Sequence, residues 1–472
     1  MSEKVTNLVQ WRGKIWVGAI ATTIFLLSLL AFVVSIKVSG KEQRDNTDAP
    51  SAAQMAILTT PGASNQVVIF PDANSPATQS FVTNLPTALP TPRPHGLSFY
   101  APNRALVSDF ANRRIFVIDP TVGQTISTID TTAIGYTGNG TIEVAPDQNT
   151  ALAYANSTSL FVVHGPFGST STITTVPLPA STLGALTQSI VFDPNGRAFI
   201  ATPVGVSVID PPYTAVAFNI SIPGNNIACS IGITPDGNTI LVTSVNDFNT
   251  VGGKVKIFNA PFSAGSTPST LSIPGASGIQ GIKVAPNGAT AIVASSDFPH
   301  AAAIQAPFTA TSVVQTLPLP ADPGPIGFED VGISSDSQLA MLAGNGPNAG
   351  QFVVLVRAPF GSSSVTSSVP INNANPIRGA GAVRFAPAST VSVSGRVTTP
   401  DGRGLRNAGV NLTDQSGIKR TATTSSFGLY SFDNVAPGQT YTMTISSRLY
   451  RFQTRTMTIS TDLTNVDFVG LE

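Results

Sequence analysis

A short turn motif that returns every 41 to 52 residues restricts the fold of this chain more than any other feature. In the clear copies, an apolar stretch ends in Pro followed by Asp or Asn. The clear copies are VAPD at residues 144–147, FDPN at 192–195, ITPD at 233–236 and VAPN at 284–287, and weaker copies are YAPN at 100–103, ISSD at 333–336 and FAPA at 385–388. Because self-similarity at a nearly fixed period is the signature of repeat architectures, the chain is predicted to repeat one structural unit.

Each repeat contains four short apolar segments. The turn is followed by a second segment, such as AIVAS at residues 291–295. A third segment ends in a small residue, Pro and an aromatic residue, as in APF at 260–262, and a fourth ends in an apolar residue and Pro, as in LPLP at 317–320. Four short strands per repeat, with Pro and Gly confined to the corners, is the pattern of a β-propeller blade.

The repeats do not begin and end with a complete unit. Six complete repeats run from residue 96 to about residue 379, and GAVRFAP at 381–387 is a first strand with nothing after it. Residues 54–86, ahead of the first repeat, carry the patterns of a second, a third and a fourth strand. Pairing the last strand with these three would remove the open edges of a linear array. The sequence therefore predicts a seven-bladed β-propeller over residues 50–388, closed by its two ends in one blade.

The repeated Pro-Asp-Gly-like turns resemble those of the YVTN/NHL-like, or lactonase-like, β-propellers of bacteria. The resemblance covers some 340 residues. It implies a fold and not a chemistry, because one scaffold of this kind serves many functions.

The pattern changes beyond residue 390. Five spaced elements then follow, and they are GRV at 395–397, PDG at 400–402, GVNL at 409–412, FGLYSF at 427–432 and PGQTYTM at 437–443. Together they closely resemble the carboxypeptidase regulatory-like domain, which implies a transthyretin-like β-sandwich over residues 390–472 and an accessory rather than a catalytic role. The family's Thr-Asp before the Gly-x-Tyr turn is Thr424-Ser425 here, so the role of that Asp does not carry over.

An apolar run at residues 15–36 is 22 residues long and contains no charge and no Pro. A helix of that length spans the roughly 30 Å hydrocarbon layer of a membrane. Three basic residues precede the run and three follow it closely, so the positive-inside rule is nearly balanced. We predict a signal anchor with residues 1–14 in the cytoplasm, a linker at 37–49, and the bulk of the chain outside the cell membrane. A cleaved signal peptide is the alternative, although its apolar region is normally about 7–15 residues long.

Composition excludes several classes of function. The 25 basic and 25 acidic side chains cancel, which argues against a nucleic-acid partner. The single cysteine, Cys229, rules out a disulfide framework and a cysteine-rich zinc site, and it is predicted to be a small buried residue. The three histidines are isolated from one another in sequence. We therefore expect no metal ion, no other cofactor and no nucleic acid.

Polar residues of the loops expected around the channel mouth form a candidate ligand face. They are Tyr136, Asn246, Asp247, Asp297, His300, Glu329, Asp330 and Arg378. Asx side chains and a stacking aromatic ring suit the hydroxyl groups of a sugar. The competing interpretation is that the Asx residues only shape turns.

A second group of candidates lies on the first strands, at a position between two apolar residues. In three blades this position is charged, and the residues are Glu143, Lys283 and Arg384. We interpret them as channel-adjacent side chains that pair with neighbouring blades or with channel water, and a catalytic set is the alternative.

These features favour a non-enzymatic function. The leading hypothesis is a membrane-anchored binding or scaffold protein of the cell envelope that recognises a glycan or a surface protein through the propeller face. A lactonase- or lyase-like hydrolase is the first alternative, and it would need metal ligands that converge from several blades. A structural surface-layer or adhesin subunit is the second.

Overall fold

The structure is a computed structural model that describes residues 54–471 apart from short gaps. The residues outside the description are 1–53, 61–65, 83–84, 86–93, 110–111, 133–140, 157, 180–188, 224–227, 245–252, 277, 296–299, 321–326, 346–351, 372–381, 389, 415–418, 436–438, 460–461 and 472. The predicted membrane span at 15–36 and the linker at 37–49 therefore lie outside it. The described residues include no helix with the length and hydropathy needed to cross a bilayer.

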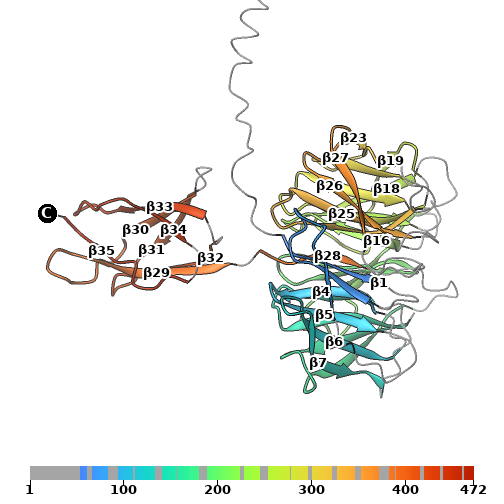
Figure 1. The fold of residues 1–472 in the computed structure, drawn as a ribbon, viewed down its shortest axis with the longest axis horizontal. Helices are drawn as coiled ribbons and strands as arrows, with labels where there is room; N and C mark the ends of the chain where they lie inside the picture. Colours follow the sequence, from blue (N-terminus) through green and yellow to red (C-terminus); the bar gives the residue numbers. More distant parts are fainter. Residues whose placement is uncertain are drawn as a thin grey trace, which may run out of the picture. The chain divides into compact units, whose positions relative to one another are not determined.

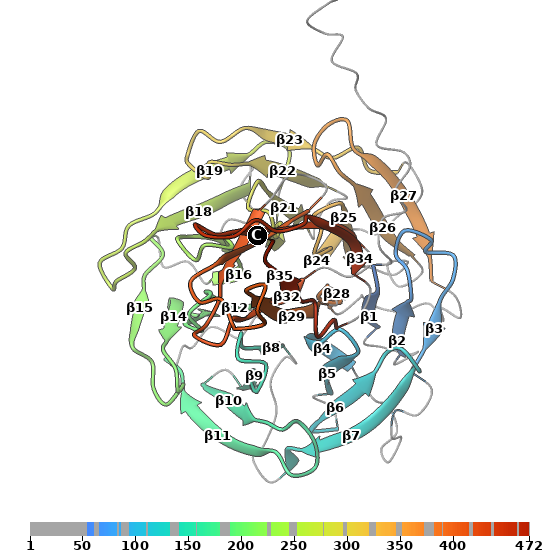
Figure 2. The same cartoon turned by 90° about the vertical axis from the view of Figure 1, so that its left-hand side faces the viewer.

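Seven four-stranded antiparallel sheets in the described part of the chain surround a common axis (Figures 1 and 2). Each sheet is one blade, and its strands are named from the innermost outward. Blade 1 is β4 (Pro94–Ala101), β5 (Arg104–Asp109), β6 (Arg114–Asp119) and β7 (Gln124–Asp130); blade 2 is β8 (Ile142–Val144), β9 (Thr150–Asn156), β10 (Ser159–His164) and β11 (Thr172–Pro177); blade 3 is β12 (Ile190–Phe192), β13 (Ala198–Thr202), β14 (Gly205–Ile209) and β15 (Phe218–Ile220).

The remaining blades repeat the same order. Blade 4 is β16 (Ala228–Ile233), β17 (Thr239–Ser244), β18 (Gly253–Asn259) and β19 (Ser269–Ile273); blade 5 is β20 (Ile279–Val284), β21 (Thr290–Ser295), β22 (Ala301–Gln305) and β23 (Val314–Thr316); blade 6 is β24 (Gly327–Ile333), β25 (Leu339–Asn345), β26 (Phe352–Arg357) and β27 (Val365–Pro370); blade 7 is β28 (Val383–Phe385), β1 (Ala56–Thr60), β2 (Gln66–Phe70) and β3 (Ser80–Phe81).

Blade 7 confirms the predicted pairing of the two ends of the domain. Strand β28 pairs antiparallel with β1, with Ile57 opposite Arg384 and Leu58 opposite Val383. Two further backbone hydrogen bonds, from Thr59 N to Ala382 O (3.0 Å) and from Ala386 N to Met55 O (2.8 Å), extend the ladder at both ends. The ring is thus closed by main-chain bonds between segments more than 300 residues apart.

The repeated turns between the first and second strands of the blades include Asx turns. The Asp147 carboxylate accepts hydrogen bonds from the backbone N–H groups of Asn149 and Thr150, at 2.9 Å each. Asp236 and Asp336 likewise each accept the N–H group two residues further on. Because the side chain supplies the acceptor, the chain reverses tightly between the first and second strands of a blade.

The apolar core is divided into layers between adjacent blades. One layer holds Val117 of blade 1 and Phe161 of blade 2, and the next holds Phe116 of blade 1 and Ile57 of blade 7. Adjacent residues of β6 therefore face opposite blades, which follows from the period of two along a strand. Similar clusters join each of the other adjacent pairs of blades. Since the middle strands are buried on both faces, their sequences are almost continuously apolar.

The C-terminal module is a two-sheet β-sandwich. One sheet has the order β32 (Leu429–Val435), β29 (Val391–Thr398), β35 (Phe468–Val469), and the other has the order β31 (Lys419–Thr423), β30 (Gly409–Thr413), β33 (Gln439–Ser446), β34 (Arg455–Ile459). Buried side chains of both sheets, among them Val393, Phe432 and Met443, form one apolar cluster. This architecture agrees with the predicted sandwich.

Thr59 joins three segments at the closure. Its buried hydroxyl donates to the carbonyl oxygen of His95 (2.6 Å) and accepts a hydrogen bond from the N–H group of Ala382 (2.8 Å). One side chain of blade 7 thus connects the residue before β28 to the innermost strand of blade 1.

Replacing Thr59 by Val should lower the free energy of unfolding by about 1–3 kcal/mol, because the buried N–H group of Ala382 would lose its acceptor. Urea denaturation followed by circular dichroism measures the change. Thr175→Val is the matched control, since this threonine is exposed on an outer strand and should tolerate the same substitution. Equal effects of the two variants would contradict the role given to the closure.

Candidate ligand site in the central channel

A cavity of about 270 Å³ lies where the innermost strands of all seven blades meet. Its walls are both polar and apolar. They are formed by His95, Gly96, Leu97, Thr141, Ile142, Ser189, Ile190, Val191, Cys229, Ser230, Ile231, Gln280, Ile282, Lys283, Asp330, Ala382 and Arg384. Because every blade contributes, the cavity exists only in the closed ring.

Three charged residues at or beside this cavity come from one repeat position, directly before the four-residue turn motif. Lys283 and Arg384 line the cavity, and Glu143 lies beside Arg384. Blade 6 has Gly332 at this position. A Cβ atom there would lie 2.9 Å from the carbonyl oxygen of Val383, so glycine permits the close approach of β24 to β28.

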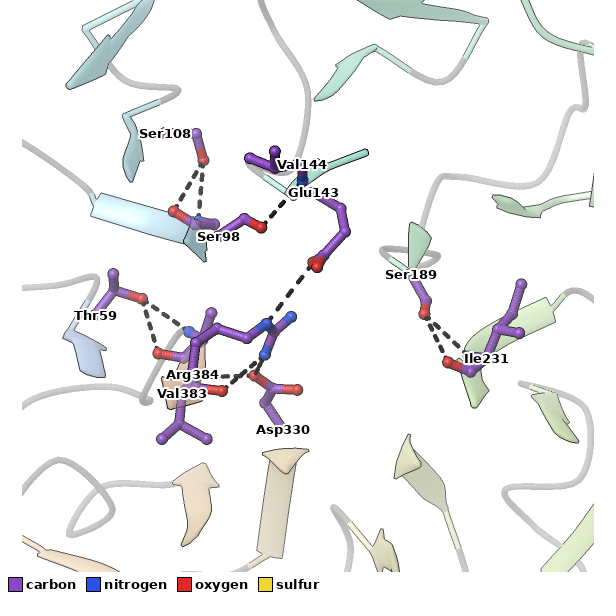
Figure 3. A network of polar contacts seen from close by, with 12 residues as sticks. Thr59, Ser98, Ser108, Glu143, Val144, Ser189, Ile231, Asp330, Val383 and Arg384 are labelled. Carbon is purple, nitrogen blue, oxygen red and sulfur yellow. Dashed lines mark hydrogen bonds and ion pairs between the residues drawn. The ribbon is translucent and has the colours of Figure 1, made fainter. Parts of the chain in front are cut away.

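Arg384 connects two carboxylates from different blades (Figure 3). Its Nη1 donates to Oδ2 of Asp330 at 2.5 Å, and its Nε lies 3.8 Å from Oε2 of Glu143. The second distance is an ion pair without a hydrogen bond, and Nε is buried with no hydrogen-bond partner among the described residues. The three side chains are 20–26% exposed, so the network is shielded from bulk water but not dry.

Asp330 also belongs to a series of side chains that bind the next blade. Ser189 Oγ accepts the N–H group of Ile231 (3.0 Å), and Ser230 Oγ accepts that of Ile282 (3.3 Å). At the equivalent position, Asp330 Oδ2 accepts the N–H group of Val383 (2.9 Å). Figure 3 shows the Ser189 contact and the Asp330 contact in one view. These side chains therefore link the innermost strands where the backbone ladders of separate blades do not meet.

Lys283 stands apart from this network. It makes no hydrogen bond or ion pair with the described residues, although it lines the same cavity and is only half-buried. Burial, and then the Arg384 guanidinium, hold the pKa of Lys283 below its usual range, against the opposing effect of Glu143 and Asp330. Burial likewise lowers the pKa of His95, against the opposing effect of Asp330.

This arrangement favours binding over acid–base chemistry. Arg384 engages Asp330 directly and Glu143 electrostatically, so neither carboxylate faces the cavity as an uncompensated base. Across the part of the chain that the structure describes, no three His, Cys, Asp or Glu side chains gather as a possible metal site. The cavity wall instead carries two cationic hydrogen-bond donors, Lys283 and Arg384.

The structure corrects the predicted position of two residues of the ligand face. Glu329 and Asp330 were expected in a loop, but both belong to strand β24, which begins at Gly327, two residues before Glu329. Asp330 therefore lies in the channel. The backbone of Glu329 is part of the strand, and its side chain is outside the description.

His300 is also part of the packing between blades. Its Nδ1 is buried without a hydrogen-bond partner among the described residues, and its Nε2 lies close to Gly275 of the preceding blade. Burial lowers the pKa of His300, and a hydrogen bond to the backbone of Pro274 opposes that shift. The other members of the predicted ligand face lie outside the described residues, and they are Tyr136, Asn246, Asp247, Asp297 and Arg378.

Several residues of the cavity were not identified from the sequence. Ser189, Ser230 and Gln280 line it, and so does Cys229, which is buried as predicted but also reaches the cavity wall. A signal was present in the repeats, because Ser189, Ser230 and Asp330 all lie three residues before the first residue of the turn motif. The alternation of apolar residues drew attention instead to the position directly before the turn motif, which holds Glu143, Lys283 and Arg384.

In the C-terminal module, Ser425 takes a structural role at the position where the family carries Asp. Its hydroxyl accepts hydrogen bonds from the N–H groups of Phe427 (3.3 Å) and Leu429 (3.2 Å). Thr424 accepts the N–H group of Ala408 (2.9 Å) and donates to the carbonyl oxygen of Leu405 (2.6 Å). Both hydroxyls therefore order the turn that precedes Tyr430.

Replacing Arg384 by Met should destabilise the propeller by about 2–4 kcal/mol, because two half-buried carboxylates would lose their cation. Adding Glu143→Gln and Asp330→Asn should restore part of that loss, which denaturation of the single and triple variants measures. The control is Arg197→Met, which breaks the more exposed pair with Asp210 and should cost about 1 kcal/mol or less. A triple variant no more stable than Arg384→Met would contradict the electrostatic role of Arg384.

Comparison with solved structures finds β-propellers at low sequence identity. The hydrazine synthase of Kuenenia stuttgartiensis is 17% identical over 64% of this chain and 95% of that chain, with a TM-score of 0.48. A streptogramin B lyase is 10% identical over 74% of this chain and 95% of that chain, with a TM-score of 0.49. A β-propeller domain from Myceliophteria thermophila is 12% identical over 59% and 87%, with a TM-score of 0.44. These similarities say nothing about the activity of this chain.

Sequence comparison assigns the smaller part of the chain. No curated protein sequence matches at a significant level. The carboxypeptidase regulatory-like domain family matches residues 392–469, which are the residues of the two-sheet sandwich. The protein thus joins an all-β propeller of four-stranded blades to a C-terminal carboxypeptidase regulatory-like domain.

Proposed function

We propose that this protein is a membrane-anchored binding or scaffold protein of the cell envelope. In this proposal residues 15–36 tether the chain, the propeller recognises a glycan through its loop face, and the C-terminal domain is an accessory module. A rigid disc held on one helix suits the presentation of a binding surface outside the membrane, and it needs no chemistry of its own.

The observation that carries the proposal is the state of the channel carboxylates. Hydrolysis in a propeller would require an acid–base pair or a metal held in a pocket. Here Arg384 lies between Asp330 and Glu143, and Oδ2 of Asp330 also accepts the N–H group of Val383. Both donors to this carboxylate belong to strand β28, so its hydrogen bonds connect blades 6 and 7.

A glycan is the partner class that the candidate face favours. Its side chains include Tyr136, Asn246 and Asp297, which supply one aromatic ring for stacking together with amide and carboxylate groups for sugar hydroxyls. The chain has no net charge, so recognition of a strongly charged polymer is not favoured.

A glycan array probed with the full chain in mild detergent tests this proposal. Binding to a defined set of glycans is expected, with a loss of at least about tenfold in the variant Tyr136→Ala/Asn246→Ala/Asp297→Ala, because hydrogen bonds and stacking would be removed together. The control is Asp401→Ala/Arg403→Ala, an exposed pair on a turn of the C-terminal domain.

Two outcomes would overturn the proposal. An array without signal would exclude glycan recognition and leave a protein as the ligand of this face. Turnover of a lactone or ester that is abolished by Glu143→Gln in a folded protein would replace the binding function with a hydrolytic one.

A further inference from the structure

We infer that the central cavity is a binding site for a small hydroxy-carboxylate, whose anionic end is held by Lys283 and Arg384. The inference does not rest on the glycan proposal, because described residues of the innermost strands carry it and not the loop residues Tyr136, Asn246 and Asp297. It rests on the free donors, the charge and the size of the cavity.

Two cationic groups at the cavity have donors to spare. Lys283 makes no hydrogen bond or ion pair with the described residues. In the Arg384 guanidinium, Nη1 is committed to Asp330 and to the carbonyl oxygen of Val383, whereas Nη2 makes no hydrogen bond within the described part of the chain. Lysine and arginine can only donate, and the described residues leave both groups with donors that a bound acceptor can take up.

The charge at the wall favours an anion as this acceptor. Two cations and one carboxylate line the cavity, and that carboxylate, Asp330, is already compensated by Arg384 and by the N–H group of Val383. Glu143 approaches Arg384 through Nε and is not among the lining residues. Charge-assisted hydrogen bonds from a guanidinium and an ammonium to a carboxylate are among the strongest that a protein makes.

The size and the neutral part of the wall define the rest of the ligand. At about 270 Å³ the cavity is smaller than the roughly 300–1,000 Å³ of pockets for drug-sized molecules. Gln280, Ser189 and Ser230 contribute amide and hydroxyl groups to the same wall. Groups of this kind pair with hydroxyl groups, so a sugar acid fits the lining better than an aliphatic acid.

The site should respond to pH through Lys283. The charged groups that act on it are Arg384, Glu143 and Asp330, and His95 faces Asp330 from blade 1. Its lowered pKa means that the ammonium loses its proton at a lower pH than an exposed lysine would. Binding requires that proton, so the affinity for a carboxylate should be highest below the lowered pKa and should fall as the pH rises through it.

Calorimetric titration of the full chain in mild detergent with D-gluconate tests the inference. Glucose, which is of similar size and uncharged, and inorganic phosphate are the comparison ligands. Gluconate should bind at about pH 6, glucose should bind at least about tenfold more weakly, and the gluconate affinity should decrease as the pH rises towards about 10.4, the ordinary lysine value. Lys283→Gln should lower the gluconate affinity at least about tenfold. Lys254→Gln, which removes a charge from a half-buried lysine of β18 outside the cavity, should leave it unchanged.

Several results would overturn the inference. They are the absence of gluconate binding, equal binding of glucose, tighter binding of phosphate than of gluconate, or undiminished binding in Lys283→Gln. If that variant does not fold, the thermal stability of the unmodified protein decides, because gluconate should raise its melting temperature more at about pH 6 than at about pH 10.4, the ordinary lysine value. An equal rise at both pH values would contradict the role of Lys283. The glycan array is interpreted through the Tyr136→Ala/Asn246→Ala/Asp297→Ala variant and the gluconate titration through Lys283→Gln, so the two proposals can fail independently.

Discussion

The pairing of β28 with β1 is the interaction on which the rest of the propeller depends. It joins the last strand of the ring to a segment that precedes all the other blades, with Ile57 opposite Arg384. Without this ladder, blade 7 would be split and two neighbouring blades would each expose an apolar face. The layers that contain Ile57 and Val383 pack against blades 1 and 6, so the closure converts a linear array into a ring in which neighbouring blades cover both faces of blade 7.

The same pairing places the chemistry of the channel. Arg384 lies on β28, so it reaches Asp330 of blade 6 and Glu143 of blade 2 only because that strand is fixed as the innermost strand of blade 7. Asp330 in turn accepts a hydrogen bond from the backbone of β28. Stability and site are therefore coupled, because the cation that compensates the carboxylates also belongs to the strand that closes the ring.

The sequence predicted the architecture well because its signals are local and repeated. The Pro-Asx turns fix where first and second strands meet, and unmatched strand patterns at the two ends imply that they pair. The site was less predictable. Asp330 was expected in a loop because the acidic residues Glu329 and Asp330 interrupt the apolar pattern of the first strand. The lack of a partner for Lys283 among the described residues depends on which side chains reach it from other blades. Those distances are set by the ring and not by neighbouring residues in the chain.

Hydrogen exchange of the backbone N–H groups at the closure, measured by mass spectrometry on the full chain, tests the central claim most directly. Peptides covering residues 54–60 and 382–386 should exchange as slowly as the middle strands of blades 4 and 5, because their hydrogen bonds should open only when the ring opens. Rapid exchange of these two peptides, while the middle strands of the other blades stay protected, would show that the ends are not paired and would contradict the account.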